Sequence, residues 1–384
     1  MRPLRSTSLL ALMAAAAACA DGGPTAAREP HAAPILASRG AAVADAFLVV
    51  LDDGADPRGL AAAMGIAPRF VYTSAVHGFA ATLNAGQLNA LRQNPAVAYI
   101  EQDAVYHAAT TQLNPPWGLD RIDQRNLPLS LSYSYNSTGT GVRAYIIDTG
   151  IQHDHPQFGT RAQNVYDAFG GTGADCNGHG THVAGIVGAA TYGVAKNVQL
   201  RGVRVLNCSG SGTTSAIVAA IDWVRANAVR PAVANLSLGG PFSSTLNTAV
   251  TNLWNAGIFT SVVAGNENRD ACTVSPASAT AVMAVAGTNR DDTRLSSGNF
   301  GPCVDIYAPG GSIPSTWIGS GAATLSGSSM AAPHVAGVAA LYKATFGDAA
   351  SSTIDTWIKT NATAGVVKNV PAGTPNRLLY KASL

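Results

Sequence analysis

From Gly141 onward, short apolar segments alternate with helix-like segments, and this alternation limits the possible folds more than any other feature of the chain. Segments such as "VRAYIID", "AVANLSL" and "AVMAVAGT" have the length of strands, and helices are predicted at 214–226, at 245–256 and after Ser329. Several strands are nearly continuous apolar runs, as expected when helices cover both faces of a parallel sheet. Residues 109–384 are therefore predicted to form an α/β domain, a three-layer α/β/α sandwich with a mainly parallel sheet.

Two segments of different character are predicted at the N-terminus. Residues 1–20 carry Arg2 and Arg5, then an apolar run, and end at the small residues "ACA", which is the pattern of a secretory signal peptide. Lipidation of Cys19 after cleavage is a weaker alternative. Residues 21–44 lack hydrophobic periodicity and are predicted to be a flexible linker.

A small domain is predicted at residues 45–108. Strand-like "DAFLVVL", helix-like "DPRGLAAAMG", further strand material and a second helix–strand pair follow one another. This order of strand, helix, strand, strand, helix and strand predicts a ferredoxin-like α+β domain that precedes the main one. No other stretch of the sequence is long and charge-free enough to predict a transmembrane helix.

The charge balance argues against nucleic acid as a partner. The 384-residue chain has a formal net charge of +2, only 12% charged residues and no basic cluster. Apolar residues make up 47% of the chain, which is enough to bury a sizeable core.

Four cysteines remain if Cys19 is removed with the signal peptide. An even number of cysteines in an exported chain predicts two disulfides, for which three connectivities are open. Their order along the chain suggests two local loops, Cys176–Cys208 and Cys272–Cys303. A zinc site is disfavoured because no pair has the short spacing that such sites use.

Three polar residues stand where a parallel sheet places its functional groups, at strand ends and at the helix starts beside them. Asp148 ends an apolar strand, His179 lies between two glycines at the start of a helix, and Ser329 begins the last long helix. Each alone has an ordinary explanation as a turn residue or a helix cap. Together they supply a nucleophile, a general base and an orienting carboxylate, in the chain order Asp, His, Ser that subtilisin has.

The segments around these residues resemble the three signatures of the subtilase family of serine peptidases, as "YIIDTG", "NGHGTHVAG" and "SGSSMAAPHVAG". The segments "PPWGLDRIDQRNLPL", "YGVAKNVQLRGVRVLNCSGSG" and "TPNRLLY" further resemble the proteinase K branch, and its aqualysin-type bacterial members in particular. Residues 45–107 resemble the inhibitor-type propeptide of the same family. The resemblance implies that Ser329, which directly precedes Met330, is the nucleophile, and that Ser328 is not.

The resemblance also assigns further residues. It implies that Asn266 is the side-chain donor to the oxyanion and that the two local disulfides form. It implies that the peptide substrate pairs with two edge segments and that a third segment lines the pocket for the residue before the cleaved bond (P1), with an apolar or aromatic preference. These substrate-binding residues are Gly210, Ser211, Gly212, Ser237, Leu238, Gly239, Val263, Ala264 and Gly265.

Structural calcium is the cofactor that the resemblance implies. One site would use the backbone carbonyls of Thr280 and Val282 with the Asp305 carboxylate, because calcium needs clustered oxygen ligands. A second site would use Asp120, Asp123 and Gln124. That site is expected to be weaker, because a serine stands where relatives can have a carboxylate ligand. The alternative is that the two aspartates pair with the nearby arginines 121 and 125.

The expected function is therefore a secreted, calcium-stabilised serine endopeptidase of broad specificity, made as an autoprocessed zymogen and cleaved near residues 107–111. Its expected partners are protein and peptide substrates and its own propeptide, and a monomer is expected. A periplasmic destination stays open beside an extracellular one. The competing interpretations are a catalytically silent binding protein of the same fold, and an esterase, which would need a G-x-S-x-G motif that the chain lacks.

Overall fold

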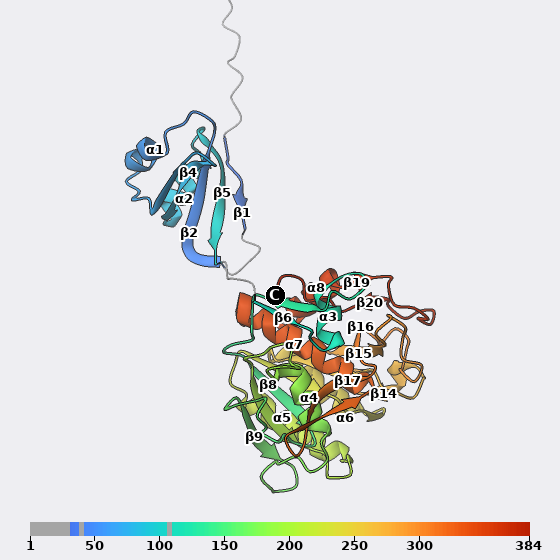
Figure 1. Ribbon diagram of the computed structural model, residues 1–384. Helices are drawn as coiled ribbons and strands as arrows, with labels where there is room; N and C mark the ends of the chain where they lie inside the picture. The colour runs from blue at the N-terminus through green and yellow to red at the C-terminus, as the bar shows by residue number, and fades with distance from the viewer. Residues whose placement is uncertain (1–30, 38–41, 106–109) are drawn as a thin grey trace, which may run out of the picture. The chain divides into compact units, whose positions relative to one another are not determined.

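The computed structural model describes residues 31–37, 42–105 and 110–384 (Figure 1). The chain divides into two compact units, with the change from the first to the second between Asp103 and Ala104. The predicted signal peptide lies outside the described residues, as does the predicted domain boundary at 108/109. None of the helices in the described ranges combines the length and apolarity that crossing a membrane requires.

Within the described residues, the N-terminal unit consists of one sheet of order β1-β5-β2-β4-β3 and two helices. Its main elements are β2 (Ala42–Leu51), α1 (Pro57–Ala63), β3 (Phe70–Thr73), β4 (His77–Thr82), α2 (Ala85–Arg92) and β5 (Val97–Ala104). Helix α2 begins with a capping box in which Asn84 and Gln87 each accept the other's backbone N–H. Val49, Phe79 and Ile100 are fully buried at the centre. The order of elements confirms the predicted ferredoxin-like α+β domain.

Part of the predicted linker belongs to this sheet. Strand β1 (Ile35–Leu36) pairs in parallel with β5, with Ile35 opposite Ile100. Ala33 is buried in the same core, and β2 already begins at Ala42. The linker prediction for 21–44 is therefore wrong for these residues. A two-residue strand is held by its tertiary neighbours and leaves no periodicity to detect.

The C-terminal unit is built on a nine-stranded sheet of order β19-β20-β16-β15-β13-β11-β8-β10-β9. Neighbouring strands are parallel throughout, except for the edge pair β19–β20. The strands are β8 (Arg143–Asp148), β9 (Ala162–Asp167), β10 (Gln199–Arg204), β11 (Ala232–Leu236), β13 (Phe259–Val263), β15 (Met283–Thr288), β16 (Ile306–Pro309), β19 (Thr363–Ala364) and β20 (Arg377–Leu378).

Helices cover both faces of this sheet. They are α3 (Trp117–Asp123), α4 (His179–Gly188), α5 (Thr214–Asn227), α6 (Ser244–Asn255), α7 (Ser328–Phe346) and α8 (Ser351–Asn361). Along β8, Ala144 and Ile146 pack in the core that contains α4 and α7, while Tyr145 and Ile147 pack in the core that contains α5 and α6. Alternate residues of one strand thus contribute to two cores, and the predicted three-layer α/β/α architecture is confirmed.

Three short strand pairs lie outside the main sheet among the described residues. Strand β6 (Thr110–Leu113) pairs with β7 (Ser132–Tyr135), and β12 (Gly240–Pro241) pairs with β14 (Val274–Ser275). Strands β17 (Ile313–Trp317) and β18 (Gly321–Leu325) form a hairpin just before α7. These elements, together with β9 and α8, are absent from the sequence-based prediction.

The structure forms both disulfides in the pairing expected from sequence. Cys176–Cys208 joins the loop before α4 to the loop after β10, with a Cα–Cα distance of 5.0 Å. Cys272–Cys303 joins the loop after β13 to the loop before β16, with a Cα–Cα distance of 5.2 Å.

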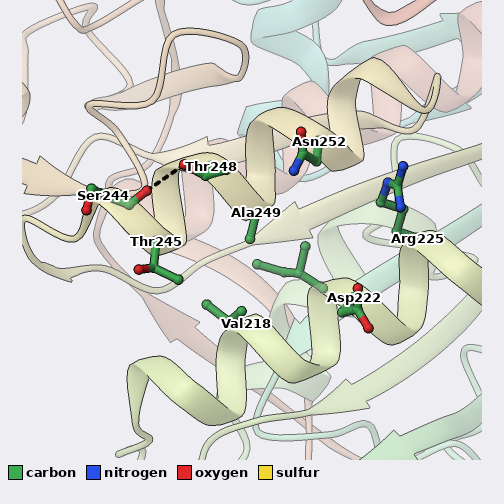
Figure 2. A pocket seen from close by; sticks show the side chains of 9 residues that line it. Val218, Asp222, Arg225, Ser244, Thr245, Thr248, Ala249 and Asn252 are labelled. Atoms are coloured by element: carbon green, nitrogen blue, oxygen red, sulfur yellow. Dashed lines mark hydrogen bonds between the residues drawn. The ribbon is translucent and has the colours of Figure 1, made fainter.

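A cavity of about 390 Å³ lies between α5 and α6 (Figure 2). Val218, Ala249 and the pair Asp222 and Arg225 are among the residues that line it. None of the predicted catalytic residues lines this cavity. Asp148, His179 and Ser329 lie instead at the end of β8 and at the starts of α4 and α7.

Candidate active site

Asp148 is the last residue of β8 and is completely buried. Strand β8 has β10 on one side and β11 on the other, so Asp148 lies where the strand order of an open parallel sheet reverses, a common position for binding sites. Its Oδ1 atom accepts hydrogen bonds from Thr149 N at 2.8 Å and from His179 Nδ1 at 2.7 Å. Its Oδ2 atom has no hydrogen-bond partner among the described residues.

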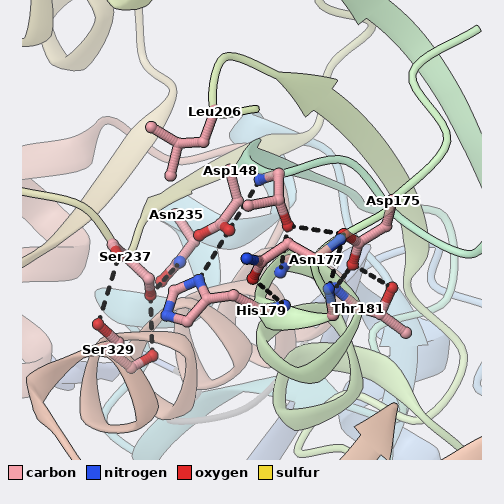
Figure 3. Close-up of polar contacts among 12 residues, drawn as sticks. Asp148, Asp175, Asn177, His179, Thr181, Leu206, Asn235, Ser237 and Ser329 are labelled. Carbon is pink, nitrogen blue, oxygen red and sulfur yellow. Dashed lines mark hydrogen bonds and ion pairs between the residues drawn. The ribbon is translucent and has the colours of Figure 1, made fainter. Parts of the chain in front are cut away.

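His179 is the first residue of α4, and its ring extends from Asp148 toward Ser329 (Figure 3). The close approach of α4 to β8 depends on Gly180, because a Cβ atom there would lie 2.2 Å from the Gly150 carbonyl oxygen. Since the carboxylate only accepts, Nδ1 carries the proton and Nε2 is left as the basic nitrogen. The aspartate therefore fixes the tautomer that a general base requires.

The pKa of His179 is raised above its ordinary value. Burial alone disfavours the imidazolium, but the negative charge and hydrogen bond of Asp148, with the charge of Asp175, outweigh that effect. The site therefore stabilises the protonated ring that forms when His179 takes up a proton.

Asp175 is a residue that the sequence analysis did not single out. Its carboxylate accepts from the backbone N–H groups of Asn177, Gly178 and Thr181, each at 2.9 Å, and from the Thr181 hydroxyl (Figure 3). It also accepts from the hydroxyl of Thr149, which in turn accepts from the N–H of Gly180. These bonds join the end of β8 to the start of α4. An acidic residue shortly before a helix start is the only signal that sequence offers for such a role.

The two adjacent serines at the start of α7 lie in different surroundings. Ser328 is completely buried and its hydroxyl has no partner among the described residues. Ser329 is half-buried, and its Oγ donates to the Ser237 carbonyl at 3.3 Å. In return Ser237 Oγ donates to the Ser329 carbonyl at 2.9 Å (Figure 3). Among the described residues no hydrogen bond joins His179 to Ser329, although apo sites often tighten only when substrate binds.

Two N–H donors lie close to each other at the start of α7, since a Cβ atom on Gly327 would lie 3.5 Å from Asn266 Nδ2 and 3.7 Å from Ser329 N. Asn266 Oδ1 accepts from Ser328 N at 2.8 Å, and this bond sets the orientation of the Asn266 amide. The Asn266 Nδ2 group and the Ser329 backbone N–H, in the first turn of α7, have no acceptor among the described residues. A helix start and a free amide thus offer two donors at one place, which is the arrangement that stabilises a developing oxyanion.

Asn299 is a second residue that sequence reasoning missed. It is fully buried, donates from Nδ2 to the Ala264 carbonyl and the Glu267 carboxylate, and accepts from the backbone N–H groups of Glu267 and Arg269. These bonds hold the loop on either side of Asn266. A buried asparagine that satisfies a loop's backbone has no sequence periodicity, so only the structure reveals it.

The predicted substrate-binding residues lie on three loops at the carboxyl ends of β10, β11 and β13 of the main sheet. Residues 237–239 follow β11. The adjacent β13 ends at Val263, and residues 264–265 follow it. A Cβ atom on Gly239 would lie 3.7 Å from the Val263 side chain, so these two segments face each other. Residues 210–212 are exposed after β10, but Ser211 has both backbone groups bonded within the loop, to Asn207. Of these three residues, only Gly210 and Gly212 have backbone groups that are still free to bind a peptide.

A family model described as "Subtilase family" matches residues 139–378, which is more than half of the chain. The chain belongs to the subtilase family. A second model, "Peptidase inhibitor I9", matches residues 67–109 and identifies the N-terminal unit as a propeptide of the inhibitor type. The resemblance to the proteinase K and aqualysin branch is confirmed, and the protein is a serine endopeptidase.

Several subtilases are similar over most of the chain. The "Extracellular serine proteinase" of Thermus sp. is 52% identical over 81% of this chain and 77% of its own length. "Proteinase R" of Parengyodontium album is 43% identical over 91% of this chain and 92% of its own. The crystal structure of a cold adapted subtilisin-like serine proteinase matches with a TM-score of 0.69 and 48% identity, and it covers 71% of this chain and 100% of that one.

Subtilases commonly bind calcium, an ion that needs several clustered oxygen ligands. In the second predicted site, Asp120 Oδ1 accepts from the N–H and hydroxyl of Ser130, and Asp120 Oδ2 accepts from Leu131 N. Gln124 Oε1 also accepts from Ser130 N, at 2.9 Å. Asp123 accepts from the Ser134 N–H and contacts the ammonium group of Lys381 at 3.0 Å. Every carboxylate oxygen there already faces a donor, and calcium does not fit.

The alternative expectation for that position, pairing with the neighbouring arginines, is also not what the structure forms. Arg121 is buried and pairs with Asp292, with its Nε 2.6 Å from Oδ1. Arg125 donates to backbone carbonyls of α8 and of the residue after it, and stacks on the Tyr380 ring. Asp120 and Asp123 instead hold the chain between α3 and β7.

At the first predicted calcium position, the carboxylate oxygens of Asp305 also face donors. Asp305 Oδ2 accepts from Ala284 N at 2.8 Å, and Asp305 Oδ1 lies 2.8 Å from the ammonium group of Lys359. Thr280, Val282 and Lys359 line the same cavity of about 410 Å³. No group of three or more His, Cys, Asp or Glu residues in the described ranges is arranged to hold a metal ion. At both positions the carboxylate oxygens already face donors, and for this reason the predicted ligand sets do not fit calcium.

Proposed function

We propose that Asp148, His179 and Ser329 form the catalytic triad of this subtilase. His179 Nε2 would take the proton of Ser329 Oγ as that oxygen attacks the peptide carbonyl, and would then give the proton to the leaving amine. Asp148 would stabilise the imidazolium without taking the proton itself. The observation that carries the proposal is the 2.7 Å contact between Asp148 Oδ1 and His179 Nδ1, which leaves Nε2 unprotonated on the side of Ser329.

The oxyanion of the tetrahedral intermediate would accept from Asn266 Nδ2 and from the Ser329 backbone N–H. Both donors lack an intramolecular acceptor in the described part of the chain, so they need not break an existing bond. Losing one such donor typically lowers kcat by about 10²–10³. The bond from Ser328 N to Asn266 Oδ1 supports this assignment because it occupies the amide oxygen and leaves the amide nitrogen free to donate.

The peptide substrate would lie extended between residues 210–212 and 237–239, with backbone pairing that is independent of sequence. The P1 side chain would enter between Gly239 and the 263–265 segment. A glycine that faces the Val263 side chain gives this position an apolar wall, which supports broad specificity with an apolar or aromatic preference at P1.

The enzyme would be made as a zymogen. Residues 1–20 would direct export and be removed, residues up to about 108 would serve as the inhibitor propeptide, and residues 109–384 would be the mature peptidase. Cleavage by the enzyme itself near residues 107–111 would release it. The extracellular proteinase from Thermus sp. supports an extracellular destination, with the periplasm as the alternative. A monomer is proposed. Calcium has no part in the proposal at the two positions whose carboxylate oxygens already face donors.

The decisive experiment compares the purified full chain with Ser329→Ala and with Ser328→Ala, a matched control that removes the neighbouring hydroxyl. The measurements are intact mass over time, casein hydrolysis and labelling by a serine-directed phosphonofluoridate. We expect the parent and Ser328→Ala chains to lose about 108 N-terminal residues, to digest casein and to be labelled, while Ser329→Ala stays full-length and unlabelled. If all three chains stay intact and unlabelled while folded, the triad is inactive and the protein is a silent binding protein of this fold.

A further inference from the structure

The two positions at which the subtilase resemblance places calcium share an unexpected feature, a lysine ammonium group on the aspartate. Lys359 lies 2.8 Å from Asp305 Oδ1, and Lys381 lies 3.0 Å from Asp123 Oδ1. We propose that these two lysines act as built-in cations at the calcium positions, so that the folded peptidase needs no calcium at either one.

Lys381 has the surroundings of a bound cation. It is almost completely buried, and its ammonium group meets three oxygens: Asp123 Oδ1 at 3.0 Å, Leu384 O at 2.8 Å and Ala382 O at 3.2 Å. An ammonium group has three protons to donate, so these acceptors satisfy it. The face of the Tyr133 ring lies 5.6 Å from the same nitrogen, a favourable place for a positive charge.

The remaining oxygens of this position are satisfied by neutral donors. Ser130 and Leu131 supply the three hydrogen bonds that Asp120 accepts, and Ser130 also bonds with the Ser132 hydroxyl. A calcium ion would have to displace these donors and the Lys381 ammonium together. The serines and the lysine thus form a closed network that replaces oxygen–metal contacts with hydrogen bonds.

Lys359 fills the corresponding role at the other position. It bridges two carboxylates, Asp305 Oδ1 and Asp355 Oδ1, each at 2.8 Å, from a position near the end of α8. Without it, two negative charges would face each other at the edge of the cavity that Thr280 and Val282 line. A divalent ion bound to Asp305 in its presence would be repelled by the ammonium at contact distance.

The residue type supports this interpretation. Only five of the 24 basic residues in the chain are lysines, and two of those five occupy the predicted calcium positions. A lysine presents a compact point charge with three donors, which is closer to a metal ion than the planar fork of arginine is.

The test uses the full chain with Ser329→Ala, which removes self-digestion and keeps one molecular species. Calcium uptake is measured by titration calorimetry on this protein and on the same protein with Asp123→Asn or Asp305→Asn. Either no uptake, or an uptake that both aspartate variants leave unchanged, supports the proposal. An uptake that either variant abolishes overturns it, because calcium then binds at that aspartate.

The second arm measures thermal unfolding of Lys359→Met and Lys381→Met, with Lys368→Met as the control on an exposed lysine. We expect the midpoint Tm to fall by at least about 5 °C for the first two and to change by less than about 1 °C for the control. Three unchanged Tm values would overturn the proposal. For Lys359→Met, 10 mM CaCl₂ should restore part of the loss. A loss that calcium leaves unchanged would overturn it at that position, because missing packing would then be the cause.

Discussion

Ser237 and Ser329 exchange two hydrogen bonds, so that the residue at the end of one substrate-binding segment fixes the backbone of the residue proposed as nucleophile. Ser329 Oγ donates to Ser237 O at 3.3 Å, and Ser237 Oγ donates to Ser329 O at 2.9 Å while accepting from Asn235 Nδ2. The contact joins β11 to the start of α7. The segment proposed to align the substrate and the residue proposed as nucleophile are therefore linked through Ser237.

Replacing Ser237 with alanine tests this link. The substitution removes the bond to the Ser329 carbonyl and leaves the Ser237 carbonyl in place, so kcat should fall by about 2- to 10-fold with little change in KM. Steady-state kinetics on a peptide substrate provide the measurement. A raised KM with unchanged kcat would mean that the residue serves only to hold the peptide.

Replacing Asp148 with asparagine should lower kcat by about 10⁴, because the neutral amide no longer fixes the His179 tautomer. The pH dependence gives a sharper test. Activity needs neutral His179, whose pKa the Asp148 charge helps to raise above its ordinary value. Removing that charge lowers the pKa, so the acidic limb of the residual kcat/KM profile should move to lower pH. If the acidic limb does not move, its pKa belongs to a group other than His179.

Asn266→Ala should lower kcat by about 10²–10³ and leave KM nearly unchanged, because the proposed hydrogen bond forms only as the oxyanion develops. Asn268→Gly, two residues along the same loop, is the matched control. Asn268 has a φ of 49°, which glycine adopts readily. The control should keep near-parental kcat. Equal losses in both variants would indicate that loop disturbance, and not the amide donor, is responsible.

Gly239→Val should change the choice of P1 residue. The new side chain would begin 3.7 Å from Val263 and fill the space between the two segments. We expect kcat/KM for a substrate with Phe at P1 to fall by about 100-fold, while a substrate with Ala at P1 is cleaved nearly as before. The ratio of the two values is the measurement, and an unchanged ratio would place the P1 side chain elsewhere.

Two buried histidines predict a loss of stability in mild acid. Burial lowers the pKa of His182 and of His334 to about 4, against an ordinary value near 6.5. Because the folded-state pKa is the lower one, their contribution is complete above about pH 6.5. It is lost as the pH falls toward about 4, by up to about 3 kcal/mol each.

Urea unfolding of Ser329→Ala between pH 7 and pH 4.5 measures this slope. His334 Nδ1 contacts the Met330 carbonyl at 2.8 Å, and asparagine can donate the same bond without titrating. His334→Asn should therefore reduce the slope. A slope that does not change would show that other groups cause the acid sensitivity.

The sequence predicted the central architecture because the buried strands carry continuous apolar runs, as β8, β11 and β15 do. It missed β9 because this edge strand, "AQNVYD", has only one fully buried residue and no apolar pattern. Helix α8 has helical spacing, with Ile354 and Ile358 buried one turn apart, but these few apolar residues stand among polar ones and the helix was not predicted. The hairpin β17–β18 was missed because its position depends on packing against distant elements rather than on a pattern of its own.

In the candidate site, too, the sequence revealed the residues that stand in local motifs and missed those that act through contacts with distant segments. Asp148, His179 and Ser329 stand in recognisable local motifs, whereas Asp175 and Asn299 act through the backbone N–H groups that they meet in the fold. The predicted calcium ligands do not match the structure for a comparable reason. The aspartates were present in sequence, but the lysines that meet them lie 54 residues beyond Asp305 and 258 residues beyond Asp123.

The disulfide Cys176–Cys208 has a consequence for an enzyme surrounded by copies of itself. The bond closes a loop of 32 residues that contains all of α4 and β10, and with them His179. A nick anywhere in that loop leaves both new ends covalently attached to the rest of the molecule. Self-digestion at one bond therefore cannot release the base-bearing helix, and a second cut inside the same loop is needed before any fragment can escape.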